Sequence, residues 1–121
     1  MTIKITIRAA LLAAAALVAT APAASASVGA TGWVHNPIVT QGLCMSLVEE
    51  IGAEAGFTVN PREAGATLNN DDGDLVIIVC DAEPYIFFVA VHDTRPVSEV
   101  RAVADDIERR LVARLDAMPT N

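Results

Sequence analysis

Residues 1–26 have the three parts of a secretory signal peptide. Lys4 and Arg8 form a basic start, residues 9–20 are an unbroken run of apolar or small side chains, and residues 24–26 read Ala-Ser-Ala, an A-x-A cleavage signal. Cleavage would leave a chain that begins near Ser27. No other feature constrains the fold as strongly, because this one removes the leader from the folded domain and places the remainder in an oxidising compartment.

The leader predicts export without a retained anchor. Its apolar run is about a dozen residues long, whereas a helix needs roughly 20 to span a bilayer. There is no Cys at the predicted cleavage point and no Arg pair before the apolar run, which argues against lipid attachment and a twin-arginine route. We expect a secreted or periplasmic protein with no membrane attachment after cleavage.

The chain without its leader is strongly acidic. It contains six Arg, no Lys and fifteen Asp or Glu residues, which gives a formal charge of −9 in place of −7 for the whole chain. Binding to phosphate backbones and anionic headgroups depends on Lys and Arg. Nucleic acid and membrane surfaces are therefore not the expected partners.

Cys44 and Cys80 are the only two cysteines, and both remain after cleavage. In an oxidising compartment such a pair predicts a disulfide. Closing a loop of this length would destabilise the unfolded chain by roughly 4 kcal/mol on the chain-entropy model. That is comparable with the whole stability of a small domain.

Residues 27–37 are expected to form an N-terminal tail, because Ser27–Thr31 is small and polar and has nothing to bury. The segment also contains Trp33, the only tryptophan. We expect Trp33 to join the core, as aromatic residues usually do in a chain with so few of them; the alternative is an exposed anchor for a ligand or partner. The folded domain is then expected to span residues 38–121.

In residues 38–55 the apolar side chains recur at spacings of three and four, which is typical of an amphipathic helix. Gly56 is placed to end that helix. Residues 57–60 are predicted to form a short strand closed by Pro61, and residues 61–74 show no period and are predicted to be a loop.

Two β-branched and aromatic runs, residues 75–79 and 85–91, predict the strands of an antiparallel β-hairpin with residues 81–84 as its loop. Beyond Pro96 a second periodic stripe predicts a long C-terminal helix. The stripe consists of Val100, Ala104, Ile107, Leu111, Leu115 and Met118.

This order of elements predicts a small single domain of the α+β class. We expect an open-faced sandwich, in which both helices pack on one face of the sheet and a disulfide from Cys80 ties the first helix to that face. With residues 81–84 as the loop, Cys80 would lie opposite Tyr85 and share a face with it. The other face would then carry Leu75, Ile77, Val79, Ile86, Phe88 and Ala90.

That second face is predicted to be an interface with a partner or with a second copy, because an apolar patch of this kind rarely stays exposed to water. Trp33 is a candidate addition to it. The alternatives are that one helix covers each face, or that Trp33 and the loop of residues 61–74 fold over the second face.

His92 and Asp93 are the candidates for acid–base chemistry, with Arg95 nearby. The geometry is poor, because consecutive strand residues point to opposite faces. No activated nucleophile is identifiable beside them, although Thr94 and Ser98 lie near in the sequence. The competing prediction is structural: Asp93 and Thr94 would cap the last helix.

The sequence holds residues for two kinds of metal site, but neither pattern predicts one. Zinc ligation by His35, His92 and the two cysteines has spacings that match no compact zinc pattern, and an exported thiol pair should oxidise. Residues 71–74 resemble a calcium loop, but Leu68 and Val79 would then occupy the first and twelfth ligand positions. A solvated turn is the expected structure.

The expected function is a non-catalytic exported binding or interaction module, with a protein or a small ligand as its unknown partner and a homodimer as one form. No catalytic residue, cofactor or metal is assigned. The alternative is a small exported hydrolase or metal-assisted enzyme centred near His92, Asp93 and Arg95.

Overall fold

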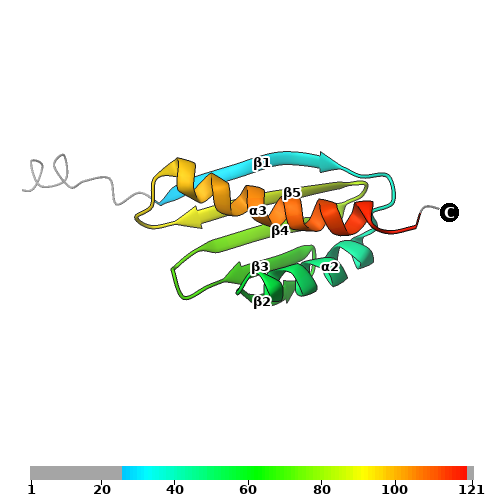
Figure 1. Cartoon of the computed structure of the whole chain (residues 1–121), viewed down its shortest axis with the longest axis horizontal. Helices are drawn as coiled ribbons and strands as arrows, with labels where there is room; N and C mark the ends of the chain where they lie inside the picture. Colours follow the sequence, from blue (N-terminus) through cyan, green and yellow to red (C-terminus); the bar gives the residue numbers. More distant parts are fainter. Residues whose placement is uncertain (1–25, 120–121) are drawn as a thin grey trace, which may run out of the picture.

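The structure is a computed structural model that describes residues 26–119 (Figure 1). The predicted signal peptide lies outside the described residues, apart from Ala26. The described part has two helices and one five-stranded antiparallel sheet, the predicted α+β class. In chain order the elements are β1 (Ser27–His35), α2 (Gln41–Glu54), β2 (Thr58–Arg62), β3 (Gly65–Asn69), β4 (Leu75–Ala82), β5 (Tyr85–His92) and α3 (Val97–Asp116).

The strands lie in the order β1-β5-β4-β3-β2. Both helices pack on the same face of this sheet: α3 covers β1 and β5, and α2 covers β2, β3 and β4 (Figure 1). The predicted open-faced sandwich is therefore confirmed, and the alternative with one helix on each face is wrong. We call the helix-covered face the inner face and the opposite one the outer face.

The core lies between the helices and the inner face. Burying each of its larger apolar side chains contributes about 1.5–3 kcal/mol. Five members of the predicted stripe on α3 are buried, whereas Met118 packs at the margin. The fully buried larger side chains are Val48, Ile51, Leu68, Val76, Ile78, Ile86, Phe88, Val100, Ile107, Leu111 and Leu115.

Local signals set the boundaries of α2. The Thr40 hydroxyl accepts a hydrogen bond from the Leu43 amide at 3.1 Å, the usual N-cap arrangement. Gly56 ends the helix with a φ of +85°, a left-handed conformation that favours glycine. The start of α3 differs from prediction, because Pro96 occupies the N-cap position without a side-chain cap, and Asp93 and Thr94 do not cap the helix.

The predicted tail is a strand. Residues 27–35 form β1, which pairs with β5 and lies beneath α3. A Cβ atom at Gly29 would stand 2.6 Å from the backbone of Arg101, so the glycine allows this close approach. β1 is stabilised by pairing with β5, which is distant in the sequence. The composition of residues 27–35 alone therefore does not predict a strand.

The predicted loop of residues 61–74 contains a second unpredicted strand. β2 continues through Pro61 to Arg62, which is tolerated because β2 is at the sheet edge. β3 then follows as a hairpin partner of β2. At Gly65 an added Cβ would lie 1.9 Å from the Ile78 carbonyl oxygen, so β3 can pair with β4 there only as glycine.

The hairpin of β4 and β5 is confirmed, but its register is one residue away from the prediction. The loop is only Glu83-Pro84, and an irregularity between Val79 and Ala82 shifts the pairing. Ile78 faces Phe88 instead of Phe87. Because a shift of one residue moves a side chain to the other face, Ile86, Phe88 and Ala90 belong to the buried core and not to the second face.

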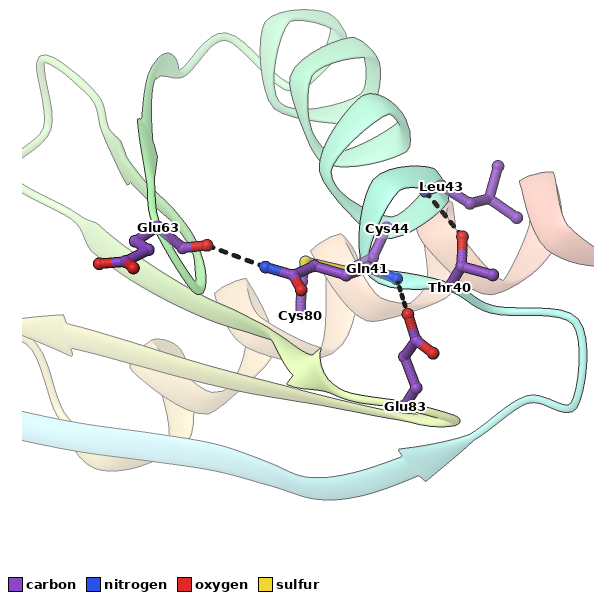
Figure 2. Close-up of a disulfide and its surroundings, with 7 residues drawn as sticks. All are labelled: Thr40, Gln41, Leu43, Cys44, Glu63, Cys80 and Glu83. Carbon is purple, nitrogen blue, oxygen red and sulfur yellow. Dashed lines mark hydrogen bonds between the residues drawn. A yellow bond between two sulfur atoms is a disulfide. The ribbon is translucent and has the colours of Figure 1, made fainter.

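The predicted disulfide joins Cys44 of α2 to Cys80 of β4, with a Cα–Cα distance of 5.7 Å (Figure 2). Beside it, the Gln41 side-chain amide donates to the Glu63 carbonyl oxygen at 2.9 Å, and the Gln41 backbone amide donates to the Glu83 carboxylate at 2.6 Å. The start of α2 is thus fastened to β4 and to two turns of the sheet.

Between Ala26 and Pro119, no helix has the length and apolar character needed to cross a membrane. The disulfide is consistent with an extracellular location, because disulfides persist in oxidising compartments.

Candidate interaction surface

The outer face of the sheet is apolar across three neighbouring strands. Cross-strand rows identify its members: Val28 pairs with Val91, and Val91 with Leu75; Ala30 pairs with Val89, and Val89 with Ile77. A third row joins Trp33, Phe87 and Val79. We call these nine residues and Tyr85 the outer patch.

The outer patch is open to solvent. Trp33 is 59% exposed, Val28 54%, Tyr85 44% and Ile77 37%. The other large side chains of the patch shield one another and are partly exposed. Contiguous apolar surfaces are uncommon on monomeric proteins, and where they occur they are often sites of interaction.

Trp33 is not a core residue, so that prediction is wrong. Strict alternation from Ala30 would point it inward, but the pairing shifts between Ala30 and Trp33, and Gly32 adopts a φ of +81° within this bulge. The extra residue turns Trp33 to the outer face. Its ring packs on Phe87 with a centroid distance of 4.9 Å and an interplanar angle of 36°.

Next to Trp33 the outer face is hollowed. Trp33, Tyr85 and Ala82 line a shallow depression of about 320 Å³ at the end of the sheet that carries the β4–β5 turn. The Tyr85 ring lies against His35, with centroids 5.2 Å apart. Aromatic side chains around a hollow can anchor a partner's apolar side chain, because they bury large areas at low conformational cost.

No carboxylate stands in the cross-strand rows of the outer face. The polar positions of these rows are His35 beside Tyr85 and, on β3 and β2, Thr67 and Asn69 paired with Asn60 and Thr58, with Arg62 at the edge. Eight of the fifteen acidic residues lie on α2 and α3, and the others lie in loops or, for Asp81, in the irregular end of β4. The molecule therefore separates an acidic helical side from an apolar side whose charged cross-strand residue, Arg62, lies at the edge.

The structure shows which of the residues predicted for this surface lie on the outer face. Leu75, Ile77 and Val79 do lie on the outer face, as does Trp33. Six members of the outer patch were missed: Val28, Ala30, Tyr85, Phe87, Val89 and Val91. The β5 members follow from the irregularity between Val79 and Ala82, because a two-residue loop without it would still pair Val79 with Phe88 and turn Phe88 outward.

His92 has a structural environment at the far end of β5. Its Nδ1 atom accepts hydrogen bonds from the backbone amides of Thr94 and Arg95, each at 3.0 Å, and its Nε2 atom donates to the Asp72 carbonyl oxygen at 2.8 Å. The ring joins the β3–β4 loop to the β5–α3 connection. Both ring nitrogens are engaged, which leaves neither free to take a proton from a substrate in this arrangement.

The neighbouring charges reinforce this junction. Arg95 binds both carboxylate oxygens of Asp74, at 3.1 and 3.2 Å, and approaches Asp72 at 3.9 Å. Asp74 is buried and also accepts from the Asn70 side chain at 2.9 Å. The carboxylates of Asp72 and Asp74 therefore lie around the Arg95 guanidinium group. Asp93 makes none of the hydrogen bonds of the His92 ring.

The four zinc candidates are not brought together. Cys44 and Cys80 are oxidised, and His35 and His92 lie at opposite ends of the paired strands β1 and β5. Within residues 26–119, no three His, Cys, Asp or Glu residues form a group that could hold a metal ion.

Neither a protein-family model nor a curated protein matches this chain in sequence. The fold and the surface define it as a disulfide-linked α+β domain with one helix-covered and one open sheet face. The open face is the feature from which its function is inferred.

Proposed function

We propose that this protein is an exported, non-catalytic interaction module and that the outer patch is its binding surface. The observation that carries the proposal is the exposure of Trp33, stacked on Phe87 at one end of an uncharged apolar surface that spans three strands. Burial of such a surface supplies the main favourable term in protein association.

The chemistry of the patch supports binding over catalysis. Nine of its ten members have no ionisable side chain, and the tenth, Tyr85, contributes a phenol hydroxyl that can donate or accept a hydrogen bond. An apolar core of aromatic residues with polar residues beside it is the usual composition of a protein interface. The polar neighbours here are those of β2 and β3.

Export rests on two independent features. The leader has the composition of a signal peptide, and the Cys44–Cys80 disulfide fits an oxidising compartment. Strand β1 begins at Ser27, one residue after the predicted cleavage signal. We propose secretion to the periplasm or the medium, and the intact mass of the secreted protein is expected to correspond to a chain starting at Ser27. A chain that still starts at Met1 would contradict export with cleavage.

Binding is tested with the secreted protein as bait in the exported protein fraction of its own cells. The wild type is expected to retain a partner, which can be a second copy carrying a different tag. A Trp33→Ala, Tyr85→Ala bait is expected to lose it, because truncation of interface aromatics commonly costs about 2 kcal/mol or more each.

Two matched controls complete the experiment. An Arg101→Ala bait, altered on an exposed position of the helical side, and an Asp93→Ala bait should retain the same partner. If the Trp33→Ala, Tyr85→Ala bait still retains the partner, the binding surface is not the outer patch. The same conclusion follows if only the Arg101→Ala bait loses the partner.

A further inference from the structure

We infer that the occupant of the outer patch is a second copy of this chain, packed sheet against sheet. This inference rests on the proposed function, in that it takes the outer patch to be a binding surface. It adds the identity of the partner and the geometry of the complex.

The charge distribution favours a second copy. Residues 26–119 carry six Arg and fifteen acidic residues, so two copies repel each other through most approaches. The outer patch is the side from which carboxylates are absent among the cross-strand rows. A partner of opposite charge would be attracted to the acidic helical side, whereas the outer patch suits a surface that is itself apolar and uncharged.

The symmetry of the patch leads to the same partner. A two-fold contact requires a surface that is complementary to itself. Three strands of apolar side chains meet this requirement, because apolar contacts need no pairing of donors with acceptors. The two sheets would lie about 10 Å apart, with strands about 30° from parallel, as in other face-to-face sheet packings.

The size of the patch fits a weak, reversible dimer. Its three strands, eight or nine residues long and about 4.8 Å apart, cover roughly 400 Å² as a flat area, and side-chain relief increases it. A standard interface takes about 800 Å² from each partner. The outer patch is therefore at the small end of the range of protein interfaces, as expected for a reversible dimer that forms at micromolar or higher concentration.

The patch also predicts where the two-fold axis passes. β5 is the middle strand of the three, and the row of Ala30, Val89 and Ile77 is the middle row. Superposing the patch on its own copy with the greatest apolar overlap therefore brings Val89 near Val89 of the second copy. Thr58, on the edge strand β2, lies far from this axis.

The test is sedimentation of the secreted protein over a concentration range around micromolar. We expect a reversible dimer that strengthens with added salt, since salt screens the repulsion between acidic copies but leaves apolar contacts intact. Val89→Arg should raise the dimer dissociation constant at least about tenfold. This substitution lowers the net negative charge of each copy, so general repulsion cannot explain the loss.

Thr58→Arg is the matched control, because it makes the same change of charge on the same face at an exposed position outside the patch. It should leave the dimer intact. A second readout uses Val89→Cys, whose added thiol is the only free one because both native cysteines are in the disulfide. A bis-maleimide of about 10 Å span should link two copies through Val89→Cys and not through Thr58→Cys.

The inference is overturned if the wild type is a monomer at all concentrations. It is also overturned if the dimer of Val89→Arg is as stable as that of the wild type, which is the result expected if two copies pair through the edge strand β1. Binding of neutral phosphatidylcholine vesicles by a monomer would make a membrane the occupant. A monomer that still captures another protein through Trp33 and Tyr85 would refute the second copy and leave the proposed function standing. Melting temperatures equal to the wild type establish that the variants are folded.

Discussion

Phe87 and Phe88 are adjacent in β5 and chemically identical, yet they belong to opposite sides of the molecule. Phe88 is fully buried beneath the helices, whereas Phe87 is partly exposed and supports Trp33. The same contrast runs along the strand, with Ile86 and Ala90 inside and Tyr85 and Val89 outside. Both faces of the hairpin are apolar, so the position of α2 and α3 decides which one becomes core.

Because only one of the two phenylalanines is in the core, truncating them should lower the free energy of unfolding by very different amounts. Phe88→Ala should lower the free energy of unfolding by about 3–5 kcal/mol, because it leaves a cavity in a closed core. Phe87→Ala should cost about 1 kcal/mol, mainly the aromatic contact with Trp33. Urea denaturation in the Val89→Arg background measures both without a contribution from self-association. Equal losses would contradict the assignment of inner and outer faces.

Removal of the disulfide tests what holds α2 on the inner face. Replacing Cys44 and Cys80 together with Ala should cost about 4 kcal/mol, since the link restricts the unfolded chain across a separation of 36 residues. The loss is measured by thermal melting beside the reduced wild type. If the double variant is as stable as the oxidised wild type, the packing of α2 on the sheet is sufficient without the disulfide.

His92 is the last inner-face residue of β5 and the only buried histidine of the described chain. His92→Ala should cost about 2 kcal/mol, because it leaves the Thr94 and Arg95 amides and the Asp72 carbonyl without their partner. Asp93→Ala, an exposed neighbour, should change stability by no more than about 0.5 kcal/mol. Chemical denaturation of both variants distinguishes a structural histidine from a dispensable one.

The smallest expected effect concerns two carboxylates on α3. Burial and the charge of Asp105 raise the pKa of Glu108. Burial would also raise the pKa of Asp106, but hydrogen bonds from Arg110 and Arg109 outweigh it and hold that pKa below its ordinary value. Two acids on the helical side thus respond to burial in opposite ways, according to whether arginine donors are present.

The two pKa shifts change the stability of the folded state with pH in opposite directions. Glu108 binds its proton more tightly in the folded state, so its ionisation costs stability as the pH rises through its folded-state pKa. Glu108→Gln should therefore stabilise the protein at neutral pH, by a few tenths of 1 kcal/mol at this partly exposed position. Asp106 stabilises above its ordinary pKa, and the contribution is lost as the pH falls through the lowered value. Melting curves of Glu108→Gln and Asp106→Asn from pH 3 to 7 should diverge from wild type in opposite directions; parallel curves would contradict the assignment.

Much of the fold could be predicted from local patterns. Spacings of three and four located both helices, and β-branched runs located β4 and β5. The strands β1 and β3 were not predicted, because Gly29 and Gly65 weaken any local strand signal while permitting close approach to α3 and β4. Their stability comes from neighbours that are distant in the sequence.

The candidate surface was only partly predictable for a related reason. The open face was expected from the number of helices and strands, but two local irregularities decided its membership. One, in β1, turns Trp33 outward, and the other, before Ala82, turns Phe87 and Val89 outward and Phe88 inward. A periodicity of two cannot reveal an irregularity that inserts a residue.

By itself, the sequence determined the class of fold, the positions of the two helices and the hairpin, and the pairing of Cys44 with Cys80. These depend on local periodicity and on the presence of only two cysteines. Only the tertiary structure decided that β1 completes the sheet, which side chains of β5 enter the core, and that Trp33 stands on the open face. Those outcomes depend on strand register and helix placement, and both are set by contacts between segments far apart in the chain.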